Sequence, residues 1–597
     1  MTLIAYQHIT RSKAVHFRVE QSLYSETMKY KLQRVGSPAR WVGEKSAWDF
    51  PTTPAALVAL AKVARETGET IEWRDGLKEF AEAHLKQSDA EHQVRLAMER
   101  IIRDKPPLDA YVTRMTQIKE GVEVPCPPLY HQQVDYHWSQ RVSGLLMAED
   151  PGVGKSRGAT DASGGWYRNG LIEPMSPAVH DGQWGVQGGV LVVCPKSVMK
   201  TWQFELSHWQ NASSILIRGE PTKKKRLAAT PTHYHVCNYD GLKFVAHNRY
   251  GGIIFDECHK LSNNTNRTQF SLTLASRAKK KLGLSGTPIA NSLESIFYPL
   301  LILDGGKALG ASKTAFLEKF FRAEHRGQFV KNIPNEGAAQ AIAAAMAEST
   351  HFVTKEEVLP FLPKKTHTPL YLEMTADQER YYNTLKNEAV AYIQDAEVTV
   401  EQASARMMKL LQVCQGFVLA DDRQGRPFNN VKTDTLFEML TDTLSGRKVI
   451  VWCYFKYEIA QVIAGLRARG IKAVHVDGDV SQRQRDADAH NWNHDPSITV
   501  FVRQLGMSEG ETLIGNESGV PCYDNIYCGL SYNYIEWKQS QDRIHRIGQN
   551  HPCSYTYLLT ENGIDKAVYE NVLQKDSTAQ FVHKEGKDYY LNLLRAA

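Results

Sequence analysis

The sequence predicts an α/β protein with two lobes, each built on a parallel sheet, with helical insertions between them and a small N-terminal α+β module. Three observations carry this prediction. Short β-branched runs alternate with helical patterns between residues 125 and 300. The same alternation returns from about residue 446, and it favours parallel strands joined by helical crossovers. The chain has 597 residues, which is too long for one ordinary core.

Four segments follow from these patterns. Residues 1–115 hold an aromatic cluster, "ARWVGEKSAWDFP", and are expected to form the N-terminal module. Residues 116–304 carry the first alternating series and form the first lobe. Residues 305–430 are rich in Ala, Lys, Glu, Met and Gln at helical spacing, which predicts helical insertions. Residues 431–597 form the second lobe.

Composition excludes several classes of protein. Hydrophobic residues make up 42% and charged residues 23% of the chain, and we find no apolar run long enough to span a bilayer. The N-terminus lacks the apolar segment of a secretory signal. The nine cysteines are scattered without a C-x-x-C pair, which predicts neither zinc nor disulfides and a reducing compartment. A net charge of +5 is too small to indicate a polyanion by itself.

The segment "AEDPGVGKS" has the composition of a phosphate-binding loop. Glycines let backbone N–H groups approach phosphate oxygens, a lysine supplies charge, and a serine hydroxyl can ligate Mg²⁺. The strict pattern wants another Gly where Glu149 stands, so the segment alone fits an accidental Gly-rich turn equally well. The candidate nucleotide-binding residues are Asp150, Gly152, Val153, Gly154, Lys155 and Ser156.

Two adjacent acids stand just past a buried apolar run in "GGIIFDECHK". Asp256 is placed to join the Mg²⁺ shell with Ser156, and Glu257 to orient and deprotonate a water molecule. Two acids at a strand end are commonly only the start of a turn. That alternative loses weight here because a candidate phosphate loop precedes the acids by about a hundred residues.

A pair of arginines in "QSQDRIHRIGQ" completes the candidate catalytic set. Arg543 and Arg546 are three residues apart and share a helix face, from which both can reach across a cleft between lobes toward the γ-phosphate. The alternative is a salt-bridged surface helix. A catalytic arginine on the second lobe would let lobe closure around ATP complete the site.

In this order, the motifs resemble those of a helicase-superfamily-two motor of the Swi/Snf-like branch, over roughly residues 125–580. "PPLYHQQVDYHW" resembles the family's glutamine motif and makes Gln132 the expected adenine reader. "DECH" and "DRIHRIGQ" fit the family's acidic and arginine motifs. The resemblance implies two RecA-like lobes, ATP and Mg²⁺ as cofactors, and double-stranded DNA as the track.

Further segments gain roles from this resemblance. "VLVVCPKSVMKTW" and "VCNYDGLK" resemble segments that touch the DNA backbone, with Lys196, Ser197, Asn238 and Tyr239 as the contacts. "LSGTPIANSLESIF" resembles the motif that couples nucleotide to DNA. The residues expected to take part in this coupling are Ser285, Gly286, Thr287 and Gln539.

The second lobe departs from the family pattern at two places. The segment "MSEGETLIGNESGVPCYDN" keeps Gly510, an expected nucleotide contact, but has Thr512 where Asn is usual. The aromatic-Asn-Pro triplet that follows the next strand in the family reads Tyr532, Asn533, Tyr534.

The N-terminal segment "LQRVGSPARWVGEKSAWDFP" resembles the HARP-type module of annealing helicases. Arg40, Trp41, Trp48 and Phe50 carry the likeness, which implies recognition of branched DNA. The aromatic residues fit the core of a small β-rich domain equally well.

These motifs favour an ATP-driven translocase that remodels branched double-stranded DNA by strand annealing or fork regression. One alternative keeps the motor and makes it displace a protein complex from DNA. The other is a nucleotide-gated DNA-binding scaffold without useful turnover. We expect a monomer with no membrane partner, in the cytoplasm of a bacterium or a virus-infected bacterial host, or in the nucleus of a eukaryote.

Overall fold

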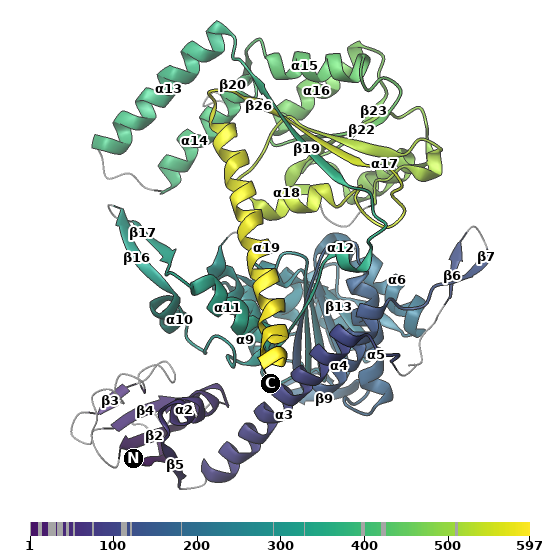
Figure 1. Cartoon of the computed structure of the whole chain (residues 1–597). Coiled ribbons are helices and arrows are strands. Elements are labelled where there is room, and N and C mark those ends of the chain that lie inside the picture. The colour runs from purple at the N-terminus through teal and green to yellow at the C-terminus, as the bar shows by residue number, and fades with distance from the viewer. Residues whose placement is uncertain are drawn as a thin grey trace.

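Figure 1 shows the computed structural model, in which two lobes lie one above the other and the N-terminal module lies beside the lower lobe. The description below covers residues 2–9, 15–21, 32, 40–42, 47–51, 54–74, 77–108, 116–119, 122–180, 182–289, 292–326, 329–395, 400–419, 425–507 and 512–596.

The N-terminal module is a mixed sheet in the order β3-β4-β2-β1-β5, packed against α2 and the first turns of α3 (Leu77–Asp104). Strand β5 is parallel to β1, and the other pairings are antiparallel. Its core is apolar, with a buried bidentate ion pair between Arg18 and Asp49. The elements are β1 (Thr2–Ile9), β2 (Val15–Gln21), β3 (Arg40–Val42), β4 (Ala47–Pro51), α2 (Pro54–Thr67) and β5 (Thr70–Trp73).

Helix α3 (Leu77–Asp104) links this module to the lower lobe, lobe 1, and Figure 1 shows it running from one to the other. Its second half packs on lobe 1, where Met98 is 2% exposed and the Arg95 guanidinium lies 4.4 Å from the ring centre of Trp138. The boundary predicted at residue 115 therefore differs from the structure, because the second half of α3 contributes apolar side chains to the core of lobe 1. The hairpin β6 (Thr116–Lys119) and β7 (Val122–Pro125) follows.

Lobe 1 is built on a sheet in the order β12-β13-β11-β14-β15-β8-β18, in which every pairing of the described strands is parallel. Buried β-branched runs such as Val190–Cys194 form its centre, as expected for strands covered on both faces. Its strands are β8 (Gly144–Glu149), β11 (Val190–Cys194), β12 (Ser214–Leu216), β13 (Tyr234–Asn238), β14 (Gly252–Asp256), β15 (Lys280–Ser285) and β18 (Thr350–Val353).

Helices cover both faces of this sheet, and a hairpin of β9 (Ser176–His180) and β10 (Gln183–Gln187) projects from it. The helices are α4 (Tyr130–Arg141), α5 (Lys155–Arg168), α6 (Met199–Gln210), α7 (Pro221–Ala228), α8 (Asn266–Ala275), α9 (Phe297–Asp304), α10 (Lys313–Phe320) and α11 (Ala338–Ala347). A second hairpin, β16 (Phe321–Arg326) and β17 (Phe329–Pro334), follows α10.

The stretch 305–430, expected to be helical insertions, contributes a strand to each main sheet. Strand β18 pairs with β8 at the edge of lobe 1, and β19 (Lys365–Leu372) pairs with β26 in the upper lobe. The Ala-rich composition around them obscures these short strands, which only pairing with distant partners identifies. Helix α12 (Lys355–Val358) lies between the two strands, and α13 (Ala376–Asp395) and α14 (Val400–Cys414) are the helices of the remainder.

The upper lobe, lobe 2, has a sheet in the order β19-β26-β25-β22-β24-β23, also parallel in every described pairing. Its other strands are β22 (Lys448–Cys453), β23 (Ala473–Val476), β24 (Val500–Gln504), β25 (Cys522–Tyr527) and β26 (Cys553–Thr560). The remaining elements are β20 (Phe417–Leu419), β21 (Gly425–Pro427), α15 (Val431–Thr441), α16 (Lys456–Ala468), α17 (Gln482–His494), α18 (Tyr534–Gln541) and α19 (Ile564–Ala596).

Helix α19 leaves lobe 2 and runs down along lobe 1, drawn in yellow in Figure 1. It contacts α11, β18 and α3 there, so the segment assigned to the second lobe also braces the first. Across the described residues, neither α19 nor a shorter helix carries a stretch both apolar and long enough to cross a bilayer.

Candidate functional site

The candidate phosphate loop, residues 150–156, joins β8 to α5 at the carboxyl edge of the lobe 1 sheet. This is the edge where parallel α/β sheets bind ligands. Gly152 and Gly154 have φ of 88° and 95°, so the loop turns through conformations that favour glycine. The Lys155 ammonium donates hydrogen bonds to the loop carbonyls of Glu149 (2.8 Å) and Asp150 (3.1 Å). The loop thus encloses a cation at the first turn of a helix, where backbone N–H groups point outward.

Gln132 lies on α4 against this loop. Its Nε2 donates to the carbonyl of Gly154 at 3.1 Å, and its Oε1 accepts from the backbone N–H of Leu129 at 2.8 Å. A Cβ at position 154 would lie 2.3 Å from this Nε2. The glutamine motif and the phosphate loop are therefore in direct contact, with Val153 buried beneath them.

Asp256 ends β14, and Glu257 follows it at the same sheet edge. The Asp256 Oδ2 accepts a hydrogen bond from Trp202 Nε1 at 2.7 Å. Burial, followed by the charge of Glu257, raises the pKa of the Asp256 carboxyl to about 7. A divalent cation beside these two adjacent acids would offset the repulsion between their carboxylates and favour the charged form of Asp256.

A polar chain links Glu257 to the coupling motif. Its Oε2 lies 3.2 Å from His259 Nδ1, which lies 3.1 Å from Ser285 Oγ. Ser285 Oγ in turn accepts from the Thr287 N–H at 3.1 Å. A Cβ on Gly286 would lie 2.6 Å from Pro151 of the phosphate loop, so the two motifs touch. We expected no role for His259 from the sequence, although its place within "DECH" could have indicated one.

Arg546 brings lobe 2 to the phosphate loop. A Cβ at Gly152 would lie 3.3 Å from the Cβ of Arg546. Burial lowers the pKa of its guanidinium, which the charge of Asp542 opposes. Arg543 is 7% exposed, and its Nε donates to the Gln539 carbonyl at 3.0 Å. The two arginines therefore differ: Arg546 lies at the loop, and Arg543 is hydrogen-bonded within lobe 2.

Lys355 is a functional candidate that the sequence did not single out. Its ammonium pairs with the Asp542 carboxylate and donates to the His545 carbonyl at 2.7 Å, while its backbone N–H donates to Asp150 Oδ2 at 2.9 Å. Burial lowers the pKa of Lys355 to about 8, against the raising effect of Asp542. Through these contacts, the buried Lys355 joins the phosphate loop of lobe 1 to the arginine motif of lobe 2. No local pattern around "TKEEV" signals this, since the partner lies 187 residues away.

The four expected DNA contacts of lobe 1 divide into two groups. Lys196 is exposed and Ser197 half-buried in the turn after β11, and Asn238 is half-buried at the end of β13. Tyr239 is 5% exposed, and its hydroxyl donates to the Asp256 carbonyl at 2.6 Å. A DNA contact by Tyr239 does not fit this burial. Its ring and hydroxyl instead support the end of β14.

The remaining expected site residues belong to the N-terminal module and to the second lobe. Trp48 is 5% exposed in the N-terminal core, which favours the core alternative for this ring over stacking on bases. Arg40 and Trp41 lie on the edge strand β3, and their side chains fall outside those that the structure describes. Gly510 also lies outside the described residues. Gln539 is buried on α18, one turn before Arg543.

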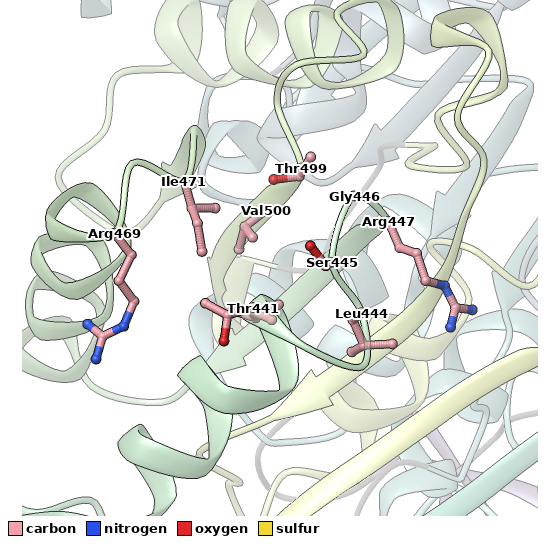
Figure 2. A pocket seen from close by; sticks show the side chains of 10 residues that line it. Thr441, Leu444, Ser445, Gly446, Arg447, Arg469, Ile471, Thr499 and Val500 are labelled. Carbon is pink, nitrogen blue, oxygen red and sulfur yellow. The ribbon is translucent and has the colours of Figure 1, made fainter.

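Figure 2 shows a pocket in lobe 2 between the end of α15 and the start of β22. Arg447 and Arg469 lie on its two sides, which would suit an anion if they were available. Arg447 pairs with Asp524 at 2.7 Å, and the Arg469 guanidinium lies 4.0 Å from the ring centre of Phe437. Both cations are thus engaged elsewhere, and we assign this pocket no role.

Comparison with known proteins finds a domain match and several similar proteins. Residues 131–417 match the SNF2-related domain. The DNA repair and recombination protein RDH54 of Saccharomyces cerevisiae is 25% identical over 487 residues, which cover 74% of this chain and 49% of RDH54. The chain therefore carries an SNF2-related domain at residues 131–417. It spans about half the length of the curated relatives it matches.

Two further curated proteins and one solved structure are also similar to the chain. The probable ATP-dependent DNA helicase CHR12 of Arabidopsis thaliana is 24% identical over 66% of this chain and 37% of its own length. The chromodomain-helicase-DNA-binding protein 1-like of Mus musculus is 22% identical over 67% and 45%. A solved structure, the Sulfolobus solfataricus SWI2/SNF2 ATPase core in complex with dsDNA, aligns with a TM-score of 0.36 and 19% identity over 79% of this chain and 96% of that one.

Proposed function

We propose that this chain is a Swi/Snf-like, ATP-driven translocase on double-stranded DNA that remodels branched DNA. The observation that carries the proposal is the meeting of Arg546 from lobe 2 with Gly152 of the phosphate loop in lobe 1. A nucleotide site completed by both lobes couples hydrolysis to lobe movement. The similarity to RDH54, a DNA repair and recombination protein, and to CHR12, a probable ATP-dependent DNA helicase, supports DNA as the substrate.

The residues fit ATP with Mg²⁺. Lys155 now donates to carbonyls of its own loop and would turn to the β- and γ-phosphates. Ser156 and Asp256 would hold Mg²⁺, which would neutralise negative charge on the phosphates. Glu257 would orient the attacking water and take its proton, and Arg546 would stabilise the charge that develops on the γ-phosphate.

A first experiment tests the hydrolytic site. Glu257→Gln keeps the size and hydrogen-bonding capacity of the side chain but removes the base, so nucleotide binding should persist while hydrolysis falls about 10²-fold or more. Fluorescent-nucleotide binding and phosphate release measure the two steps. Normal turnover by the variant would contradict the role of Glu257.

A second experiment tests the track. Phosphate release is measured without DNA, with single strands, with plain duplex and with a model fork, alongside displacement of a third strand from a triplex. A translocase on duplex should be stimulated most by duplex and fork and should displace the third strand. Equal rates in all four conditions would instead favour the nucleotide-gated scaffold.

The N-terminal module supplies the proposed preference for branched DNA. Arg40 and Trp41 lie on β3 at the free edge of its sheet, and a basic–aromatic pair suits unpaired bases at a junction. Changing both to Ala should remove the extra stimulation by forks while leaving stimulation by duplex. The matched control is Arg74→Ala, since exposed Arg74 follows the opposite edge strand. Displacement of DNA-bound protein without an effect on bare forks would favour the alternative cargo.

A further inference from the structure

A buried cluster of histidine and carboxyl side chains lies directly behind the phosphate loop, outside the groups that the proposed hydrolysis uses. Asp135 comes from α4, Glu149 from the end of β8 and His351 from β18. Each offers one oxygen or nitrogen atom, and these atoms all lie within 4.8 Å of one another. Asp135 and Glu149 are 0% exposed and His351 is 3% exposed.

The fold assembles this cluster through the periodicities of strand and helix. Strand β18 lies parallel to β8 with His351 opposite Met147. Alternate residues of a strand point to the same face, so Glu149 projects to the face on which His351 lies. Helix α4 packs on β8, and its residues His131 and Asp135 are four apart and share one side. The consecutive elements α4 and β8 thus meet β18, whose His351 lies 216 residues after Asp135.

The cluster contains polar atoms that nothing described in the protein satisfies. Neither oxygen of Glu149 nor Oδ2 of Asp135 accepts a hydrogen bond from a donor among the described residues. Only a proton shared between the two carboxyls would link them, and burial raises the pKa of both, Asp135 to about 7 and Glu149 to about 8. Buried carboxylates without a cation or donors are costly.

We propose that Asp135, Glu149 and His351 form a binding site for a divalent transition-metal ion, of which Zn²⁺ fits best. An imidazole nitrogen and carboxylate oxygens are ligands that zinc takes at about 2.0–2.2 Å. Glu149, with both oxygens available, can fill two of four positions. The imidazole favours zinc over Mg²⁺ or Ca²⁺, which prefer oxygen ligands alone.

Binding exchanges protons for the ion. His351 Nδ1 and Asp135 Oδ1 are 2.6 Å apart and hold a proton between them. When the ion takes the place of this proton at Nδ1, the neutral ring carries its one proton on Nε2, and the proton that the carboxyl pair retains goes to solvent. Tetrahedral ligand atoms lie about 3.3 Å apart, so small side-chain rotations bring the three residues to the ion.

The site would fasten the phosphate loop to the lobe. His131 Nε2 lies 3.9 Å from Glu149 Oε2 and 3.0 Å from the Val153 carbonyl, so it connects the cluster to the loop. Because the three ligands meet only in the folded lobe, the ion binds the folded state and stabilises it. The expectation of no zinc rested on cysteine spacing, which carries no information about ligands from histidine and carboxylate side chains.

The test uses the full chain, stripped with a chelator and dialysed against Zn²⁺. Elemental analysis should find about one tightly held zinc per chain, and X-ray absorption at the zinc edge should show nitrogen and oxygen ligands with an imidazole signature. The melting temperature should rise with Zn²⁺. A wild-type chain that retains no zinc and shows no change in melting, or one whose zinc has sulfur ligands, overturns the proposal without recourse to variants.

Variants then locate the ion. His351→Gln and Asp135→Asn should lose the zinc and its effect on melting. His235→Gln is the matched control and should retain both, because His235 is also 0% exposed but has both ring nitrogens engaged, by the Tyr250 hydroxyl at 2.8 Å and the Thr230 carbonyl at 2.9 Å. Asp256→Asn should also keep the zinc. Loss in Asp256→Asn with retention in His351→Gln would place the ion at the nucleotide site and overturn the proposal.

Discussion

At the scale of single residues, Glu257 occupies a backbone conformation that non-glycine residues seldom adopt. Its φ is 54° in the left-handed region, which costs about 1 kcal/mol or more. The conformation turns the chain abruptly after β14 and sets the carboxylate against His259. Such strain persists where the surroundings impose it, and here it positions the proposed catalytic base.

The pKa of Asp256 gives a pH-dependent prediction. A carboxyl with a pKa near 7 holds a proton below that pH, and the proton competes with Mg²⁺. The apparent affinity for Mg²⁺ should therefore fall about tenfold per pH unit below 7 and level off above it. Titration of Mg²⁺ at pH 6, 7 and 8, followed by fluorescent-nucleotide binding, measures this.

Glu257→Gln supplies the control for that dependence. The variant removes the negative charge that helps to raise the pKa of Asp256, so the loss of Mg²⁺ affinity should begin at a lower pH. A profile that stays in place would mean that burial alone sets this pKa.

At the scale of elements, the phosphate loop and helix α4 are in close contact at the start of α5. Gly154 caps α5 in a left-handed conformation with φ of 95°. A side chain there would collide with the amide of Gln132 on α4. The glycine thus serves both a turn and a close approach between two elements.

Gly154→Ala should lose ATP binding by about tenfold or more, because the added methyl displaces Gln132 and distorts the loop. Binding of a fluorescent nucleotide and the melting temperature are measured together. Gly170→Ala is the matched control: its φ is 65° and open space surrounds it. Both variants should lose about 1 kcal/mol of stability from backbone strain, while Gly170→Ala keeps its affinity. Equal affinities in the two variants would contradict the contact.

At the scale of the whole molecule, buried charge at the lobe boundary holds the two lobes together. Lys355 and Asp542 are 5% and 3% exposed, and Lys365 approaches the same carboxylate at 3.8 Å. Burial opposes ionisation, but the three cations Lys355, Lys365 and Lys538 lower the pKa of Asp542 below its usual range. The pair joins the two motifs that approach each other in the proposed hydrolysis.

Lys355→Met should destabilise the protein by about 3 kcal/mol, because it leaves a buried carboxylate with a more distant partner. Adding Asp542→Asn should recover part of this loss, and the two changes should not be additive. Urea unfolding of both single variants and the double variant measures the coupling.

The exposed pair Lys456–Asp479 serves as the control for this cycle. Lys456→Met should cost less than about 1 kcal/mol, because water screens an exposed pair. A coupling between Lys355 and Asp542 no larger than that of this surface pair would contradict the bridge.

Local patterns were sufficient to predict the alternating strands and helices and to propose a candidate site. The alternation of β-branched runs and helices predicted two parallel sheets, since each run buries a strand independently of its partners. The phosphate loop and the acids after β14 were found because glycine, lysine and carboxylates leave a short-range signal. The prediction of a DNA contact by Tyr239 could not take into account that this residue is 5% exposed, because burial depends on what packs over a residue.

The sequence by itself determined the fold class and the candidate phosphate loop, acids and arginine motif, because each of these patterns is encoded within short stretches of the chain. Only the tertiary structure decided that α3 joins lobe 1, that β18 and β19 divide between the sheets, and that Lys355 bridges the lobes. It alone brought Asp135, Glu149 and His351 together. The physical reason is that strand pairing and buried charge depend on partners hundreds of residues away, which no local pattern specifies.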